Sequence, residues 1–414
     1  MHLRGRPGIP AVERPLTPEE VKKMRLRKIR RPLYILCTFF LLTPLSFGKP
    51  ALAQDPPPAA PPPDPPKRVL RGEAATDSAQ PTLRAAAATE WTLHKTADNL
   101  HPDDNEQQML WLMNRARANP DQEGVWLATT PLEDVAGGRD YFDVNLPQLQ
   151  AEFGQYAAKP PAAFDARLYA AAEAHTLDLI ARDAQDHDGQ FEAIADAGFV
   201  YTAARGNVFA YAASALNAHA AFNIDWGGTD GTGMQTGRGH RMAVMSIDGD
   251  YTNVGIAAVA KSKGDLVVTG NYCRADTLNA AHYNRFLVGT VWADANGNDM
   301  YDPGEGLEGI TVRPDQGQYF AVTADSGGYA FPILAPGTYT VTFSGATLSG
   351  DVTRSVTIAA QSLLLDLLAD DLSPPPDDGD SPSDDTGSGS SDGSGDGGGS
   401  GCFIDILGRP PMRT

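Results

Sequence analysis

Apolar residues follow two different periods along the chain. Over residues 91–285 they recur at helical spacing and in short buried runs, whereas over residues 286–372 they alternate with polar residues. Helical spacing mixed with short apolar runs predicts helices and strands together, and sustained alternation predicts strands alone. We therefore expect an α+β domain followed by an all-β domain.

The first domain is expected to contain three helices, a loop and two strands. Asp104 is the expected N-cap of the first helix, with Gln107 three residues later, and the helix should end at Asn119-Pro120. The predicted segments are helices over 104–119, 165–183 and 214–224, a glycine-rich loop over 227–239, and buried strands over 255–259 and 266–269.

The second domain has the pattern of a small β-sandwich. Short alternating runs are separated by Pro-Gly and Gly-Gly turns, which is typical of a sandwich with about seven strands. The expected strands cover 287–292, 310–313, 319–323, 329–333, 338–343, 352–358 and 363–368.

A twelve-residue loop joins the first two of these strands and has the oxygen spacing of a Ca²⁺ site. Position 6, usually glycine, is Asp299, which must adopt a positive φ. The alternative is an Asn/Gly-rich turn that binds no ion. The expected ligands, at positions 1, 3, 5, 7, 9 and 12, are Asp294, Asn296, Asn298, the backbone carbonyl of Met300, Asp302 and Glu305.

Both ends of the chain differ in composition from the two domains. Residues 1–53 combine a basic segment, an apolar run over 33–47 and Ala51-Leu-Ala53, the layout of a cleaved signal peptide. An uncleaved membrane anchor is the alternative. Residues 54–90 form a Pro/Ala-rich linker and residues 373–401 an acidic Gly/Ser-rich tether. We expect an extracytoplasmic protein, secreted or at the cell surface.

The net charge limits which partners the chain can bind, and the number of cysteines limits whether disulfides can hold the fold together. The net charge of the whole chain is −19. Residues 1–53 hold 11 basic and 3 acidic residues, so the chain without them has 22 basic and 49 acidic residues and a net charge of −27. Nucleic acid is therefore an unsuitable partner, and we expect membrane contact only through the signal peptide or tail processing. Cys273 and Cys402 remain after cleavage, too few for a disulfide framework.

The first domain resembles the CAP (SCP) superfamily of secreted proteins over about residues 105–275, and is most similar to its bacterial members. The order and spacing of several short motifs carry the resemblance. They are Leu112-Met-Asn114-Arg115-Ala-Arg117, Ala174-His175-Thr-Leu-Asp178, His187-Asp-Gly189, Gly206-Asn207-Val208, His240-Arg241-Met and Tyr251-Thr-Asn-Val254-Gly255.

This resemblance implies an α-β-α sandwich with a cleft of two histidines and two acidic residues, which in some members binds a divalent cation such as Zn²⁺. His187 and His240 match the two histidines, Asp225 is a candidate for the second acid, and His219 is a further cleft candidate. Gly206 stands where the first acid is expected. The alternative role of both histidines is to hydrogen-bond the cleft loops together.

The second domain resembles the serine-aspartate-repeat B-type (SdrD B-like) modules of bacterial surface adhesins, which are prealbumin/Ig-like sandwiches. The resemblance implies a rigid stalk with calcium bridging loop to sheet. Its motifs are Gly289-Thr-Val-Trp292-Ala-Asp294-Ala-Asn296-Gly-Asn298, Gly306-Leu-Glu-Gly309-Ile-Thr-Val312, Asp325-Ser-Gly-Gly328-Tyr-Ala-Phe331 and Pro336-Gly337-Thr-Tyr339-Thr-Val341.

The last residues, 402–414, begin with Cys402-Phe403-Ile404 and are similar to the Cys-Phe-Ile box at the ends of some exported bacterial proteins. Such a cysteine is either an attachment site or a free thiol. The chain as a whole is expected to be an extracellular or surface binding protein for a lipid or cell-envelope ligand. Two alternatives are a metal-assisted hydrolase using His187 and His240, and a structural or adhesive surface protein.

Overall fold

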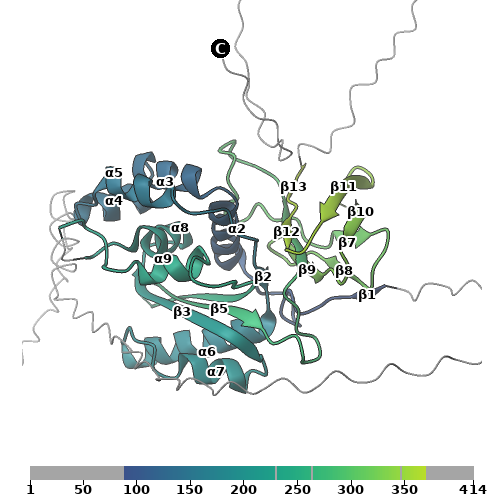
Figure 1. Cartoon of the computed structure of the whole chain (residues 1–414), viewed down its shortest axis with the longest axis horizontal. Helices are drawn as coiled ribbons and strands as arrows, with labels where there is room; N and C mark the ends of the chain where they lie inside the picture. Colours follow the sequence, from purple (N-terminus) through teal and green to yellow (C-terminus); the bar gives the residue numbers. More distant parts are fainter. Residues whose placement is uncertain (1–87, 229–230, 263, 346, 370–414) are drawn as a thin grey trace, which may run out of the picture. The chain divides into compact units, whose positions relative to one another are not determined.

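The computed structural model describes residues 88–228, 231–262, 264–345 and 347–369 (Figure 1). The predicted signal peptide, the acidic tether, the Cys402 tail and all but the end of the Pro/Ala-rich linker lie outside this range. No helix in the described part of the chain has the length and apolarity needed to cross a bilayer.

Within the described residues, the helices belong to the first domain. They are α2 (Asp104–Ala118), α3 (Pro120–Thr129), α4 (Glu133–Tyr141), α5 (Leu146–Phe153), α6 (Ala166–Arg182), α7 (Gln190–Asp196), α8 (Ala215–Ala220), the π-helical turn η1 (Ala221–Asp225) and α9 (Gly239–Val244).

A four-stranded sheet with the order β2-β4-β5-β3 forms the centre of the first domain. Its strands are β2 (Ala163–Phe164), β3 (Tyr201–Ala212), β4 (Asn253–Ala260) and β5 (Leu266–Ala275). Figure 1 shows α6 and α7 on one face of this sheet and α8 and α9 on the other. Fully buried residues on both sides, among them Leu168 of α6 and Ala218 of α8, exclude water from the sheet.

The second domain is built from two further sheets, with the orders β1-β8-β7-β10-β11 and β12-β6-β13, and with β9 paired to β6. Phe331, Val341 and Phe343 are fully buried in its core. The strands are β1 (Thr89–Glu90), β6 (Phe286–Trp292), β7 (Thr311–Pro314), β8 (Tyr319–Val322), β9 (Gly328–Pro332), β10 (Gly337–Ser344), β11 (Val352–Ile358), β12 (Leu363–Leu364) and β13 (Leu367–Leu368).

The residues before the first domain add an edge strand to the sandwich. Thr89 and Glu90 pair in parallel with Tyr319 and Phe320 of β8, and Trp91 is buried in the sandwich core. The predicted boundary between linker and first domain at residues 90 and 91 therefore needs correction, since both sides of it pack on the second domain.

Two other sequence predictions need correction. The N-cap of α2 is Asp103, not Asp104, and its capping box uses Glu106 instead of Gln107. The last predicted strand is divided into β12 and β13, because the Asp366 carboxylate accepts the Thr290 amide hydrogen (2.8 Å) where a backbone carbonyl would continue the ladder. The helix at 165–183 and the remaining predicted strands are confirmed to within one or two residues, except that β5 continues to Ala275, well past the predicted 266–269. The helix predicted over 214–224 is α8 followed by η1.

Asp366 makes the stability of the sandwich depend on pH. Burial raises its pKa to about 6 from the ordinary value of 3.8. The protonated Asp366 carboxyl therefore stabilises the fold fully at pH values below its ordinary pKa of 3.8, the value in the unfolded chain. This stabilisation is lost as the pH rises through about 6. We expect Asp366→Asn, whose amide oxygen can still accept from Thr290, to raise the free energy of unfolding at pH 8 by on the order of 2 kcal/mol and to change it little at pH 4.

Urea unfolding of wild type and variant at both pH values measures this effect, and exposed Asp351 provides the control substitution Asp351→Asn. A variant less stable than wild type at pH 8 would show that the ionised Asp366 is favourable, contrary to this account.

Candidate functional site

The loop from Asp294 to Glu305 is held by its own acidic side chains. The Asp294 carboxylate accepts hydrogen bonds from the backbone N–H groups of Gly297 (2.7 Å), Asn298 (3.2 Å) and Asp299 (2.8 Å). Asp299 has a φ of 58°, which confirms the predicted left-handed turn at position 6. Desolvation opposes the ionised form of Asp294, but these backbone hydrogen bonds outweigh it and lower its pKa.

Glu305 and Asp302 close the same loop. The buried Glu305 accepts from the backbone N–H groups of Ala295 (3.0 Å) and Asp302 (2.8 Å), one on each carboxylate oxygen. Asp302 Oδ2 accepts from the side-chain amides of Asn296 and Asn298, both at 2.7 Å. The loop thus carries residues of the types that bind Ca²⁺ on one short stretch of backbone. Their carboxylates accept from N–H groups here, and the Asn296 and Asn298 amides present their NH₂ groups to Asp302.

His240 and Asp225 form the second candidate site. His240 Nδ1 donates to Asp225 Oδ1 at 2.7 Å, and the backbone N–H of His240 donates to Asp225 Oδ2 at 3.1 Å. The Asp225 side chain is fully buried, whereas 24% of the His240 side chain is exposed. Phe222 stacks on the His240 ring. The carboxylate therefore fixes the orientation of an imidazole that solvent and ligands can reach.

Arg241 holds the backbone that carries Asp225. Its guanidinium is fully buried and donates to the carbonyls of Asn223 and Ile224 in η1, and also to the Glu152 carboxylate. Arg238 binds the same carboxylate at 2.9 Å. The adjacent residues of α9 therefore have different roles, since His240 faces the site and Arg241 anchors η1 beneath it.

His187 is bound to a neutral partner. Its Nδ1 donates to Gln190 Oε1 at 2.6 Å, and the buried Gln190 amide donates in turn to Asn271 Oδ1 at 2.9 Å. A Cβ placed on Gly206 would lie 2.6 Å from this amide, so Gln190 fills the space beside Gly206. The next residue, Asn207, donates to the His240 backbone carbonyl (3.0 Å), so neighbouring residues of β3 contact the surroundings of both histidines.

His219 lies in a buried polar network. Its Nε2 donates to Glu123 Oε1 at 2.8 Å, with both side chains 2% exposed, and Arg115 pairs with the same carboxylate. Burial lowers the pKa of His219, which Glu123 opposes. This geometry indicates a structural role, because the ring has no access to solvent. His175 is likewise buried, as its position on an apolar stripe predicts.

The Ser246 hydroxyl and the Cys273 thiol also have structural roles. Ser246 Oγ donates to the Gly249 carbonyl (2.8 Å) and accepts from Tyr251 N–H (2.9 Å). Cys273 is fully buried in β5, and burial raises the pKa of its thiol. Neither group is placed as an activated nucleophile.

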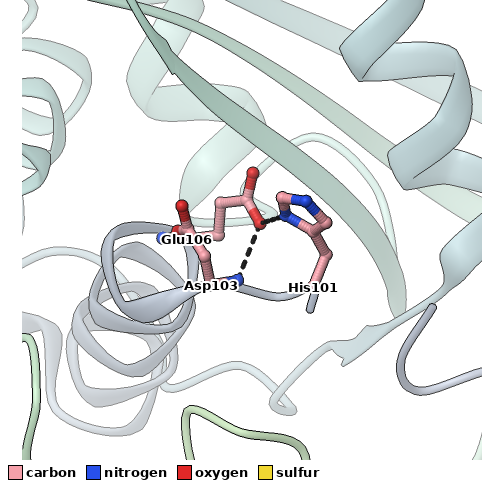
Figure 2. Close-up of side chains that lie close together, drawn as sticks. All are labelled: His101, Asp103 and Glu106. Carbon is pink, nitrogen blue, oxygen red and sulfur yellow. Dashed lines mark hydrogen bonds and ion pairs between the residues drawn. The ribbon is translucent and has the colours of Figure 1, made fainter. Parts of the chain in front are cut away.

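Among the described residues, the His, Cys, Asp and Glu side chains close enough to share one metal ion are His101, Asp103 and Glu106, whose ligand atoms lie within 4.8 Å of one another. Figure 2 shows Glu106 pointing to the His101 ring and to the Asp103 backbone nitrogen. Asp103 and Glu106 form the capping box of α2, and His101 Nδ1 donates to the Glu106 carboxylate. A cation there would displace the capping hydrogen bonds and meet the positive end of the helix dipole, so we assign this group a structural role.

Residues 287–362 match the SdrD B-like domain family, which agrees with the resemblance and the β-sandwich expected from the sequence. No curated protein matches the chain. The matched segment starts within β6, includes the Asp294–Glu305 loop and ends just before β12.

Proposed function

We propose that this protein is an extracytoplasmic binding protein, secreted or displayed at the cell surface. Its first domain is CAP-like and binds a lipid or cell-envelope ligand near His240, and its SdrD B-like domain binds Ca²⁺. The signal-peptide layout of residues 1–53 supports the location, and a loop with calcium-site spacing suits a compartment where the ion is plentiful.

Calcium would be held by Asp294, Asn296, Asn298, the Met300 carbonyl, Asp302 and Glu305. The donor set supports this assignment, since it consists of three carboxylates, two amides and a carbonyl. When bound, the ion supplies an electrostatic crosslink between the two ends of the loop. The left-handed turn at Asp299 allows the chain to bend within so short a loop.

The observation that favours binding over catalysis in the first domain is the surroundings of His187. Gly206 provides no carboxylate, and the Gln190 amide occupies the space beside it. The fully buried Asp225 carboxylate is hydrogen-bonded to His240 and orients it, which leaves two imidazoles as ligands where a catalytic zinc site has three protein ligands.

Co-sedimentation of the mature chain with isolated cell envelopes and with phosphatidylcholine vesicles tests the proposed binding. We expect His240→Ala to weaken binding by about tenfold, because the exposed ring lies at the proposed contact and a central interface residue is worth 1–2 kcal/mol. The control is Gln122→Ala, which removes an exposed polar side chain on α3. If neither probe binds the wild type, the structural or adhesive alternative is favoured.

A hydrolase is the second candidate function, and the Asp225–His240 pair favours it. A carboxylate bound to Nδ1 leaves Nε2 as the basic nitrogen, the orientation that general-base histidines use. Under the binding proposal the wild type holds no stoichiometric Zn²⁺ in this cleft. Zinc that is present at one equivalent and lost in His240→Ala would establish the metal-assisted hydrolase instead.

The double variant Gly206→Glu with Gln190→Ala gives a further test, because it supplies the missing carboxylate and removes the amide that occupies its space. We expect this variant to bind Zn²⁺ more tightly than wild type.

A further inference from the structure

The proposed calcium loop packs on a helix of the other domain. Met300 and Tyr301, in the middle of the loop, are buried in one apolar cluster with Trp111 and Leu112 of α2. Trp111 also meets Trp292, the last residue of β6, edge to face at 5.8 Å. The loop is therefore part of the junction between the domains as well as of the sandwich.

Gln108 connects this helix directly to a proposed calcium ligand. Its side-chain Nε2 donates to Asp302 Oδ1 at 2.8 Å and to the Tyr301 backbone carbonyl at 3.2 Å. Gln108 is 4% exposed, which is unusual for a glutamine. Because water hardly reaches its amide, these two acceptors satisfy the amide N–H groups instead. The Tyr301 hydroxyl donates to the Ser326 carbonyl (3.0 Å), which fixes the other side of the same segment.

The Asp302 carboxylate accepts hydrogen bonds both from its own loop and from helix α2 of the other domain. Its Oδ2 accepts from Asn296 and Asn298 within the loop, whereas its Oδ1 accepts from Gln108 across the junction. A side chain that hydrogen-bonds a metal ligand orients it and alters metal affinity, commonly by tenfold or more. Because coupling free energies are reciprocal, an ion that fixes Asp302 must stabilise the Gln108 contact by the same amount.

We propose that Ca²⁺ bound by the Asp294–Glu305 loop locks helix α2 against the sandwich, with Gln108 as the positioning residue for Asp302. The inference rests on the proposed calcium binding and goes beyond it. Calcium stiffens the connection between the binding domain and the sandwich, in addition to the sandwich itself. The two domains then move as one body when calcium is present and separate more readily when it is removed.

The test compares the full chain with its Gln108→Ala, Gln107→Ala and Gln122→Ala variants. Gln107 makes a junction hydrogen bond to Thr290 Oγ1 (2.8 Å) away from the loop, and Gln122 is exposed on α3. Isothermal titration gives the Ca²⁺ affinity. Hydrogen exchange of the peptide spanning 104–118, with Ca²⁺ or with EDTA, reports the opening of α2.

We expect Gln108→Ala to bind Ca²⁺ about tenfold more weakly and to lose most of the calcium-dependent protection of α2. Gln107→Ala should keep the wild-type affinity while loosening the junction, and Gln122→Ala should match wild type in both measurements.

Three outcomes would overturn the proposal: wild-type affinity in Gln108→Ala, equal losses of affinity in Gln107→Ala and Gln108→Ala, or α2 protection that is independent of calcium in the wild type. A wild type that binds no calcium would instead refute the calcium site itself.

Discussion

Replacing Arg241 by Met should lower the free energy of unfolding by about 3 to 4 kcal/mol. Methionine retains much of the side-chain volume but removes every donor of a fully buried guanidinium. The carbonyls of Asn223 and Ile224 then remain buried without their partner, and Glu152 loses one of its two arginines. Urea unfolding monitored by circular dichroism measures the change.

Arg205→Met is the control for this substitution. Arg205 also pairs with a carboxylate, that of Asp248, but 45% of its side chain is exposed. Exposed pairs contribute little, so the control should change stability by no more than about 0.5 kcal/mol. If Arg241→Met costs as little as the control, Arg241 does not hold η1, and the fixed orientation of Asp225 needs another explanation.

The double variant Asp294→Ala with Glu305→Ala should abolish the stabilisation of the full chain by calcium. Calcium at about one hundred times its dissociation constant adds about 2.7 kcal/mol to the free energy of unfolding of a protein with one site. Removing positions 1 and 12 deletes the ligands at both ends of the loop. Thermal unfolding in Ca²⁺ and in EDTA measures the difference.

The calcium-free forms must be compared separately, because the two carboxylates also accept backbone hydrogen bonds without an ion. A double variant of the same charge, Asp325→Ala with Asp351→Ala, changes exposed sandwich residues outside the loop. It should retain the full calcium shift. Equal shifts in wild type and in the Asp294/Glu305 variant would show that calcium acts elsewhere.

The sandwich could be predicted almost completely from the sequence because each of its strands is short, alternating and bounded by turn residues. There are two exceptions. The edge strand β1 comes from residues assigned to the linker, and at Asp366 a side chain replaces a backbone acceptor, which no local pattern indicates. The positive φ of Asp299 could be predicted because loop position 6 requires it.

The first domain was harder to predict. Asn119-Pro120 predicts the end of a helix, but Asn119 also caps α3 and Pro120 is its first residue. The strand β3 was missed because Tyr201–Ala212 is rich in alanine and contains glycine, which weakens the strand pattern. A motif located His240, whereas Asp225 was only a candidate acid outside the motifs, and the contact between them depends on the fold.

Buried glutamines were the features least visible in the sequence. Gln108 and Gln190 resemble exposed polar residues on helices, yet both are buried and bind residues far away in the chain. A lone glutamine carries no motif, and its burial follows from tertiary packing. No feature of the sequence therefore connects α2 to the Asp294–Glu305 loop, and the hydrogen bond from Gln108 to Asp302 is established only by the structure.

Titration of Ca²⁺ into the EDTA-treated full chain measures directly whether the loop binds the ion. We expect one ion per chain at the Asp294–Glu305 loop, and we expect it to be lost when Asp294 and Glu305 are both replaced by alanine. A wild-type chain that takes up no calcium, or a double variant that still binds one equivalent, would contradict this expectation.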